Sequence, residues 1–184
     1  MNPMSHLKKL IVCALCVALC YVLPVVFHMV GLGTIFSPMH IPVLLCGLAC
    51  GGWYGLLCGL LGPVLSSIVS GMPPAIMLVR MIPELMAYGL VTGLGMRFIR
   101  TGSLLADSYI SMVIAMILGR VVGGVATAVY YAVTSGTYSF ALWGATYFVE
   151  SLPGILAQLV VIPAVVFTLE KARLTPVRYP KVTI

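Results

Sequence analysis

Four ionisable side chains lie within strongly apolar stretches of this sequence, namely Arg80, Glu84, Arg120 and Glu150. No Lys, Arg, Asp or Glu occurs between Lys9 and Arg80, so these charges are isolated. A charge near the middle of a lipid bilayer costs roughly 2.5–3.5 kcal/mol on insertion scales. Such side chains persist when they pair with each other, line a cavity or bind a ligand. We therefore take these four residues as the first candidates for a functional site.

Helical spacing places the four charges on polar stripes of three predicted helices, because residues three or four apart share one helix face. Such stripes should face one another rather than lipid. Together with aromatic residues near the outer helix ends, they are typical of a small-molecule pocket. The stripes consist of Arg80, Glu84, Tyr88 and Thr92, then Arg120, Gly123, Thr127 and Tyr130 or Tyr131, and finally Tyr147, Glu150, Gly154 and Gln158. The aromatic residues are Phe36, Tyr88, Tyr138, Trp143 and Tyr147.

A purely structural role is the alternative for the same charges. Arg80 can pair with Glu84 within one helix, and Arg120 can pair with Glu150 across two helices. Buried ion pairs are weak support for a function, whereas ionisable residues within membranes are more often functional. At a rise of 1.5 Å per residue, Arg80 lies about 9 Å and Glu84 about 15 Å inward from the turn that ends at Pro74. The polar cluster is therefore expected in the outer half of the bilayer.

The composition predicts an all-α polytopic membrane protein. Hydrophobic residues make up 61% of the 184 residues and charged residues 8%, with a mean hydropathy of +1.15, which excludes a soluble domain. A membrane span needs about 20 apolar residues, so we expect one compact domain, residues 1–184, of six transmembrane helices. Gly51 and Gly52 divide one long apolar run into two short spans. The predicted spans are about 7–27, 40–51, 53–70, 75–97, 106–133 and 140–168.

The basic residues outside the predicted spans all fall on one side of the membrane. The opposite loops, 28–39, 71–75 and 134–139, contain no Lys or Arg. By the positive-inside rule, both termini are then cytoplasmic. The net charge of +6 is thus a topology signal and does not imply a nucleic-acid partner. The residues concerned are Lys8, Lys9, Arg97, Arg100, Lys171, Arg173, Arg178 and Lys181.

The cysteines, histidines and glycines predict packing rather than metal binding. The Cys13-x-x-Cys16 string lies in a predicted membrane helix, without a second such string or a cluster of histidines. The six cysteines are expected to be small packing residues, and no metal, cofactor or disulfide is predicted. His28 and His40 flank the first external loop, and His40 is either an interfacial side chain or one polar group of a binding site. Gly47, Gly51, Gly55 and Gly59 recur every four residues, which favours close helix packing.

The chain resembles the substrate-binding (S) components of energy-coupling factor vitamin transporters over nearly its whole length. The resemblance rests on the size, the six predicted spans, and the string Ala14-Leu-Cys-Val-Ala18, which matches the AxxxA motif of the family's first helix. The segments Phe36-Ser-Pro-Met-His-Ile-Pro-Val-Leu-Leu-Cys-Gly47, Gly62-Pro-Val-Leu-Ser-Ser and Gly71-Met-Pro-Pro74 are similar to one subgroup of these proteins, the pantothenate type.

The resemblance implies a multi-pass protein of a bacterial cell membrane that captures a small water-soluble vitamin near the external face. It implies that Ala14 and Ala18 dock on a transmembrane coupling subunit driven by two cytoplasmic ATPases. The chain has no Gly-rich phosphate loop with a Lys, so it is not expected to be the ATPase itself. The candidate substrate-binding residues are Phe36, His40, Arg80, Glu84, Tyr88, Arg120, Thr127, Tyr131, Trp143, Tyr147, Glu150 and Gln158.

The identity of the vitamin stays open between several chemistries. Two arginines suit an anion, because guanidinium binds carboxylate through two parallel hydrogen bonds, and pantothenate is the preferred candidate. If both glutamates neutralise the arginines, pyridoxine or hydroxymethylpyrimidine fits as well, and folate or riboflavin are further alternatives. An intramembrane enzyme is the competing class, but no HExxH motif occurs and no His lies near the serines in the apolar segments. A small channel is the third reading, but paired opposite charges and large aromatic residues on a polar face suit a closed pocket better than a pore. A structural membrane subunit is the remaining class.

Overall fold

The computed structural model describes residues 4–29, 31, 38–134, 139, 143–145 and 151–171, apart from the side chains of Ala75, Ile76 and Glu170. The expectations for Phe36, Tyr147 and Glu150 lie outside these residues. The described part of the chain is helical and contains no strand. Its helices are α1 (His6–Met29), α3 (His40–Cys50), α4 (Gly52–Ser70), α5 (Ala75–Phe98), α6 (Leu104–Val133) and α8 (Leu152–Lys171).

Five of the described helices are long and apolar enough to cross a membrane, and α3 is shorter. With 11 residues, α3 spans only about 16 Å, about half of a hydrocarbon core of about 30 Å. The short span predicted over residues 40–51 agrees with α3 in its bounds, and α3 by itself is too short to cross the hydrocarbon core. The predicted break between the second and third helices is confirmed, because Gly51 has a φ of 99° that other residues rarely adopt.

The last helix begins later than its apolar pattern suggests. A single helix over residues 140–168 was expected, but Ser151 is a turn residue and α8 starts at Leu152. Pro153 explains this start, because proline has no backbone N–H to continue a preceding helix and is tolerated in a first turn. The other four predicted spans agree with α1, α4, α5 and α6 to within two residues at each end.

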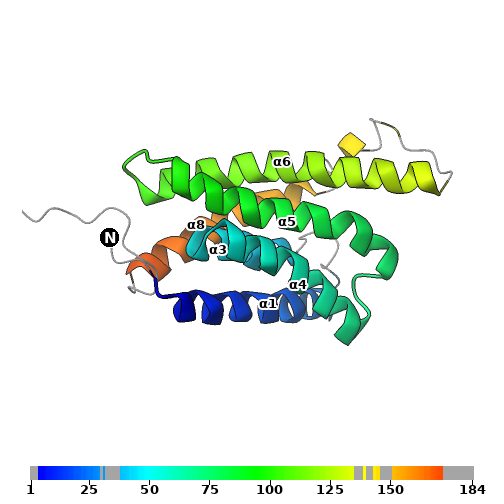
Figure 1. The fold of residues 1–184 in the computed structure, drawn as a ribbon, viewed down its shortest axis with the longest axis horizontal. Helices are drawn as coiled ribbons and strands as arrows, with labels where there is room; N and C mark the ends of the chain where they lie inside the picture. Colours follow the sequence, from blue (N-terminus) through cyan, green and yellow to red (C-terminus); the bar gives the residue numbers. More distant parts are fainter. Residues whose placement is uncertain are drawn as a thin grey trace, which may run out of the picture.

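The helices form a bundle in which α3 lies inside. Figure 1 shows α6, α5, α4 and α1 following one another across the molecule, with α8 behind. The short helix α3 packs against α1, α4, α5 and α8, and seven of its 11 residues are buried. Because α3 contacts four helices, the side chains at its start lie within the bundle.

Glycines allow α4 and α5 to approach closely, as their spacing predicts. A Cβ atom added to Gly55 would overlap the backbone of Gly89, and a Cβ atom added to Gly89 would overlap Gly55. Gly59 meets the backbone of Leu85 in the same way. Backbone contact of this kind is the usual means of packing helices in lipid, where no hydrophobic effect drives association. It holds α5, which carries the first polar stripe, in a defined rotation.

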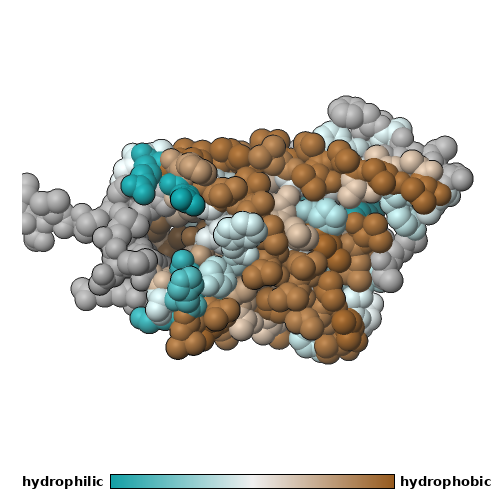
Figure 2. Space-filling model, viewed as in Figure 1, coloured by the Kyte–Doolittle hydropathy of each residue, from teal (hydrophilic) through white to brown (hydrophobic). Residues whose placement is uncertain are grey.

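Basic residues gather at one end of the bundle. In Figure 1, α1 begins, α5 ends and α8 ends at the left, so Lys8, Lys9, Arg97 and Lys171 lie near that end. Figure 2 shows hydrophilic side chains on the same end and a broad hydrophobic surface over the middle of the molecule. This distribution agrees with helices that cross a membrane together. The side on which this end lies stays a prediction.

Candidate functional site

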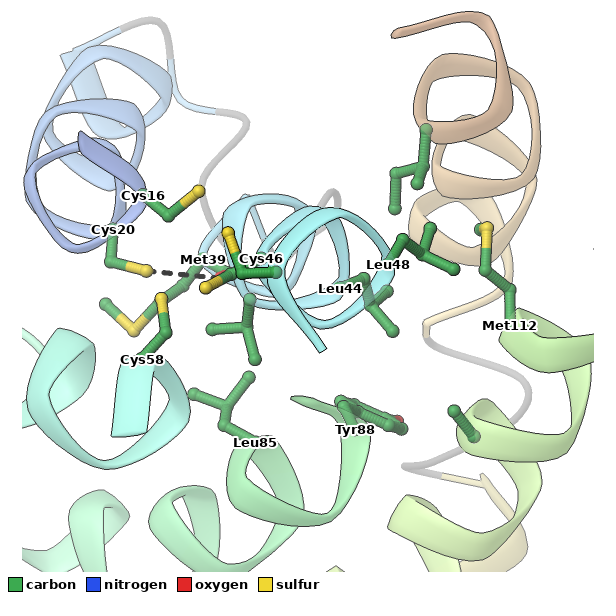
Figure 3. Close-up of a cluster of buried hydrophobic side chains, with 14 of the residues drawn as sticks. Cys16, Cys20, Met39, Leu44, Cys46, Leu48, Cys58, Leu85, Tyr88 and Met112 are labelled. Atoms are coloured by element: carbon green, nitrogen blue, oxygen red, sulfur yellow. Dashed lines mark hydrogen bonds between the residues drawn. The ribbon is translucent and has the colours of Figure 1, made fainter. Parts of the chain in front are cut away.

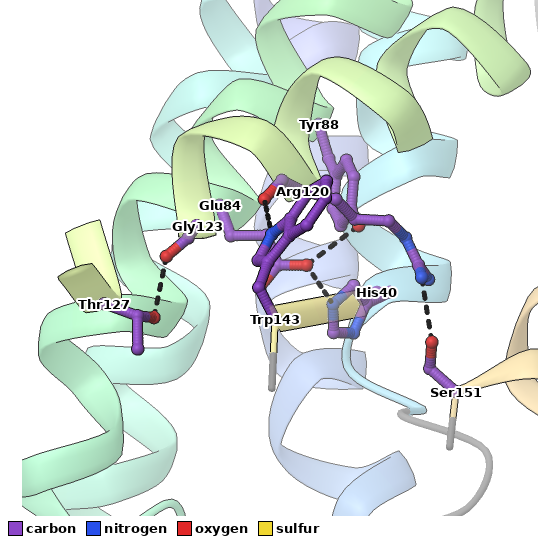
Figure 4. Close-up of polar contacts among 8 residues, drawn as sticks. All are labelled: His40, Glu84, Tyr88, Arg120, Gly123, Thr127, Trp143 and Ser151. Atoms are coloured by element: carbon purple, nitrogen blue, oxygen red, sulfur yellow. Dashed lines mark hydrogen bonds and ion pairs between the residues drawn. The ribbon is translucent and has the colours of Figure 1, made fainter. Parts of the chain in front are cut away.

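Glu84, Tyr88 and His40 form a polar cluster inside the bundle (Figure 4). The hydroxyl of Tyr88 donates a hydrogen bond of 2.8 Å to Oε1 of Glu84. Nε2 of His40 lies 3.8 Å from the same oxygen, close enough for an ion pair when the imidazole is protonated. The rings of His40 and Tyr88 also pack at a centroid distance of 5.2 Å. Glu84 is 7% exposed and Tyr88 is 1% exposed, so solvent screens these contacts little.

Two glycines of α6 make room for this cluster. A Cβ atom at Gly119 would overlap the Tyr88 ring, and one at Gly123 would lie 3.0 Å from Oε2 of Glu84. The Gly119/Gly123 spacing in α6 therefore accommodates two polar side chains of the α5 stripe, Tyr88 and Glu84. A side chain at either glycine would push Glu84 or Tyr88 out of place.

His40 lies much deeper than its position beside a predicted external loop suggests. The thiol of Cys20 in α1 donates to the carbonyl of Met39 at 3.8 Å, and the thiol of Cys50 donates to the carbonyl of Lys9 at 3.7 Å. Thus α3 runs from the level of Cys20 to the level of Lys9. Cys20 is about 21 Å along α1 from His6. The interfacial alternative for His40 is wrong, since its side chain is 12% exposed and faces Glu84.

Arg120 is at the centre of a second group of hydrogen bonds, next to the cluster of Glu84, Tyr88 and His40 (Figure 4). Its Nη1 donates a 2.8 Å hydrogen bond to Oγ of Ser151, and the indole Nε1 of Trp143 donates to the Arg120 carbonyl at 3.2 Å. The Trp143 indole lies directly over Gly124, where a Cβ atom would overlap it. Arg120 is 6% exposed and lies close enough to the Tyr88 hydroxyl to interact with it, so the two arrangements are continuous (Figure 4).

Arg80 lies one helical turn from Glu84 but does not pair with it. Within the described residues, Arg80 makes no ion pair or hydrogen bond, and it is half-buried. Glu84 instead accepts from Tyr88 and faces His40. The structural alternative of an Arg80–Glu84 pair is therefore wrong. The second proposed pair, Arg120 with Glu150, lies outside the described residues because of Glu150.

The remaining predicted residues are spread more widely. Thr127 is buried, and its hydroxyl donates to the carbonyl of Gly123 at 2.7 Å, one turn from Glu84. Tyr131 is half-buried and packs edge-on against Tyr130 near the end of α6. Gln158 is buried on α8.

Sequence reasoning missed Ser151 and Asp107. Ser151 directly precedes α8, and a serine before an apolar helix with proline in its first turn is a helix-cap signal. Asp107 is fully buried in the first turn of α6, where Oδ1 accepts hydrogen bonds of 2.8 Å from the backbone N–H and the hydroxyl of Thr101. Asp107 therefore stabilises the turn between α5 and α6, at the end of the bundle where the basic residues gather, and it is not part of the Glu84 cluster.

The polar cluster is suited to binding a small polar molecule. No group of three or more His, Cys, Asp or Glu side chains in the described residues is arranged to hold a metal ion. The hydroxyls of Ser66 and Ser67 donate to the carbonyls of Met72 and Pro73 at 2.7 and 2.8 Å, so they stabilise a turn. The cluster combines a carboxylate, two guanidinium groups nearby, and aromatic faces, which together can orient a small ligand.

Apolar helices of spanning length around an internal polar cluster define a polytopic membrane protein. A model of the family described as "ECF transporter, substrate-specific component" matches residues 8–172. The chain belongs to this family, and it is therefore a transporter subunit that captures a vitamin-type substrate rather than an enzyme. No curated protein and no solved structure matches the chain.

Proposed function

We propose that this S component binds one small water-soluble vitamin from the external side, in a pocket that includes Glu84, Tyr88, His40 and Arg120. The family supports the vitamin-type substrate. The observation that carries the location is the continuous polar cluster from α3, α5 and α6, in which Glu84 and Arg120 are both buried inside the bundle. Ionisable groups at this depth are expensive unless a ligand or a partner uses them.

Pantothenate is our first candidate for the vitamin. Glu84 is engaged by Tyr88 and His40, so it does not neutralise Arg80 one turn away. A half-buried guanidinium without a carboxylate partner in the described residues favours a ligand that brings its own carboxylate. Pantothenate has one carboxylate, with hydroxyl and amide groups for the remaining polar side chains.

A neutral, hydroxylated heteroaromatic vitamin such as pyridoxine is the second candidate. It is favoured by the Glu84 carboxylate, which can accept a hydroxyl or a ring N–H, and by the nearby rings of His40, Tyr88 and Trp143. Hydroxymethylpyrimidine has the same chemistry. Folate and riboflavin would need a larger aromatic slot.

We further propose that α1 docks on a transmembrane coupling subunit that two cytoplasmic ATPases drive. Ala14 and Ala18 are exposed on α1, on the face opposite the buried cysteines of that helix. Small exposed residues four apart allow another helix to approach closely in lipid. In this arrangement both termini lie in the cytoplasm of a bacterial cell, on the side marked by the basic residues.

Thermal-shift measurements with purified protein and a panel of B vitamins test the proposal. A ligand at 100 times its Kd stabilises the native state by about 2.7 kcal/mol, so one vitamin should raise the Tm clearly.

Arg80→Ala should weaken the binding of pantothenate at least tenfold and that of pyridoxine little. Arg100→Ala, at an exposed arginine beyond α5, should change the binding of neither vitamin. The proposal fails if well-folded protein shifts with no vitamin. Equal losses for both ligands in Arg80→Ala would refute the anion site.

A further inference from the structure

Basic and aromatic side chains of α1 and α4 meet at the end of the bundle where α1 begins. The imidazole Nδ1 of His6 lies 3.2 Å from the hydroxyl of Tyr54, within hydrogen-bonding distance. The ammonium Nζ of Lys9 lies over the Tyr54 ring, 5.8 Å from its centroid, which is the geometry of a cation–π contact. Trp53, the residue before Tyr54, is 77% exposed at the start of α4. We call His6, Lys9, Trp53 and Tyr54 the boundary cluster.

The backbones that carry the boundary cluster are held together by two cysteine thiols of the core that Figure 3 shows in part. The thiol of Cys13, one turn beyond Lys9 on α1, donates to the carbonyl of Tyr54 at 3.6 Å. The thiol of Cys50, the last residue of α3, donates to the carbonyl of Lys9 at 3.7 Å. Lys9 is half-buried, and its side chain lies against α4. Three helices therefore fix the positions of these side chains.

The positive charge of the boundary cluster has no acidic partner among the described residues. No described carboxylate forms an ion pair with Lys9 or His6. The two acids whose side chains the structure describes, Glu84 and Asp107, accept hydrogen bonds from other residues. When the Tyr54 hydroxyl donates to Nδ1 of His6, the imidazole carries its hydrogen on Nε2 and can donate it to an anion. An ammonium and an imidazole N–H around one phenol can thus bind a single phosphate group.

The boundary cluster lies where the hydrocarbon core meets the lipid headgroups. Helix α1 has 24 residues and is about 36 Å long, slightly more than a hydrocarbon core of about 30 Å, so its first turn reaches the headgroups. Leu7 and Leu10, close to Lys9 in the sequence, are 67% and 56% exposed. An exposed tryptophan such as Trp53 is typical of this depth. The acyl chains of a phospholipid would cover these apolar side chains, whereas a soluble anion would not.

We propose that the boundary cluster binds the phosphodiester of an anionic phospholipid such as phosphatidylglycerol. Lys9 supplies the positive charge, His6 supplies an N–H donor, and Trp53 supplies the surface against which the glycerol and the upper acyl chain pack. Basic side chains between helices at a membrane surface are a general means of holding anionic headgroups. The site is separate from the polar cluster of Glu84, because α3, about 16 Å long, lies between Cys50 and His40.

Native mass spectrometry of the full-length protein in detergent, with equal amounts of phosphatidylglycerol and phosphatidylcholine of the same acyl chains, tests the proposal. The wild-type protein should retain one phosphatidylglycerol more tightly than phosphatidylcholine. Lys9→Gln should weaken the binding of phosphatidylglycerol about fivefold, the contribution of one basic residue near an anionic membrane surface. Arg100→Gln is the matched control and should leave this binding unchanged. Arg100 is exposed just beyond α5, which ends on the opposite side of this end of the bundle from the start of α1 (Figure 1).

Three results would overturn the proposal. The first is equal retention of phosphatidylglycerol and phosphatidylcholine by the wild-type protein. The second is an equal loss in Lys9→Gln and Arg100→Gln, which would show only a general attraction between basic residues and anionic lipid. The third is displacement of the retained lipid by inorganic phosphate, which would show that the ligand is a soluble anion.

A labelling experiment on the wild-type protein keeps the test valid if Lys9→Gln fails to fold. Phosphatidylglycerol with a photoactivatable group at the top of one acyl chain should label residues 7–10 or 53–54. An excess of unlabelled phosphatidylglycerol should suppress this label, and phosphatidylcholine should not. Label confined to other residues, or suppressed equally by both lipids, would refute the site. None of these measurements depends on vitamin binding.

Discussion

The Tyr88–Glu84 hydrogen bond offers the sharpest quantitative test of the internal polar cluster. The bond is 2.8 Å long, and both residues are almost fully buried, so solvent does not compete for it. Tyr88→Phe removes the donor and keeps the ring that packs on His40 and over Gly119. Glu84→Gln keeps an acceptor of the same shape and removes the charge. The two changes together form a double-mutant cycle.

The expected energies follow from the chemistry of the acceptor. A buried hydrogen bond to a charged group contributes about 1.5–3 kcal/mol, whereas one between neutral groups contributes about 0.5–1.5 kcal/mol. Tyr88→Phe should therefore lower the free energy of unfolding by about 2 kcal/mol in the wild-type chain and by about 1 kcal/mol in the Glu84→Gln chain. The coupling energy is then about 1 kcal/mol, beyond the few tenths by which independent sites fail to add.

Equilibrium unfolding in mixed micelles, followed by tryptophan fluorescence, measures these values. Tyr109→Phe is the matched control, because Tyr109 is 42% exposed on α6, and it should change stability by less than about 0.5 kcal/mol. If Tyr88→Phe costs the same in both backgrounds, the carboxylate is not the charged acceptor of this bond. If Tyr88→Phe costs no more than the control, the buried hydrogen bond between Tyr88 and Glu84 does not stabilise the protein.

Two further substitutions test the packing of α5 and the exposed face of α1. Gly89→Ala should destabilise the protein by about 1–3 kcal/mol in the same unfolding assay, since its Cβ would overlap Gly55. Gly144→Ala, where a Cβ meets no atom within 4 Å, is the control, and similar losses at both sites would refute close backbone packing. Replacing Ala14 and Ala18 by Leu should preserve vitamin binding and abolish uptake in cells that contain the coupling subunits. Normal uptake would exclude this face as the docking site.

Hydropathy and helical spacing were sufficient for the bounds of four helices and for the buried polar face of α5. Apolar runs of spanning length predicted four of the helices closely, and the glycine pair at Gly51 correctly divided α3 from α4. The spacing of Glu84, Tyr88 and Thr92 correctly placed them on one buried face of α5. These features follow from local rules, because a 3.6-residue period and a break at glycine depend only on neighbouring residues.

The sequence by itself determined which side chains share a helix face, and the tertiary structure decided which faces meet. Arg80 and Glu84 have ideal spacing for an ion pair, yet Glu84 bonds Tyr88 and faces His40, 44 residues away in the sequence. Helical spacing contains no information on the depth at which α3 begins or on the room that Gly119 and Gly123 provide. These depend on how separate helices pack, because contacts between helices join residues that are distant in the chain.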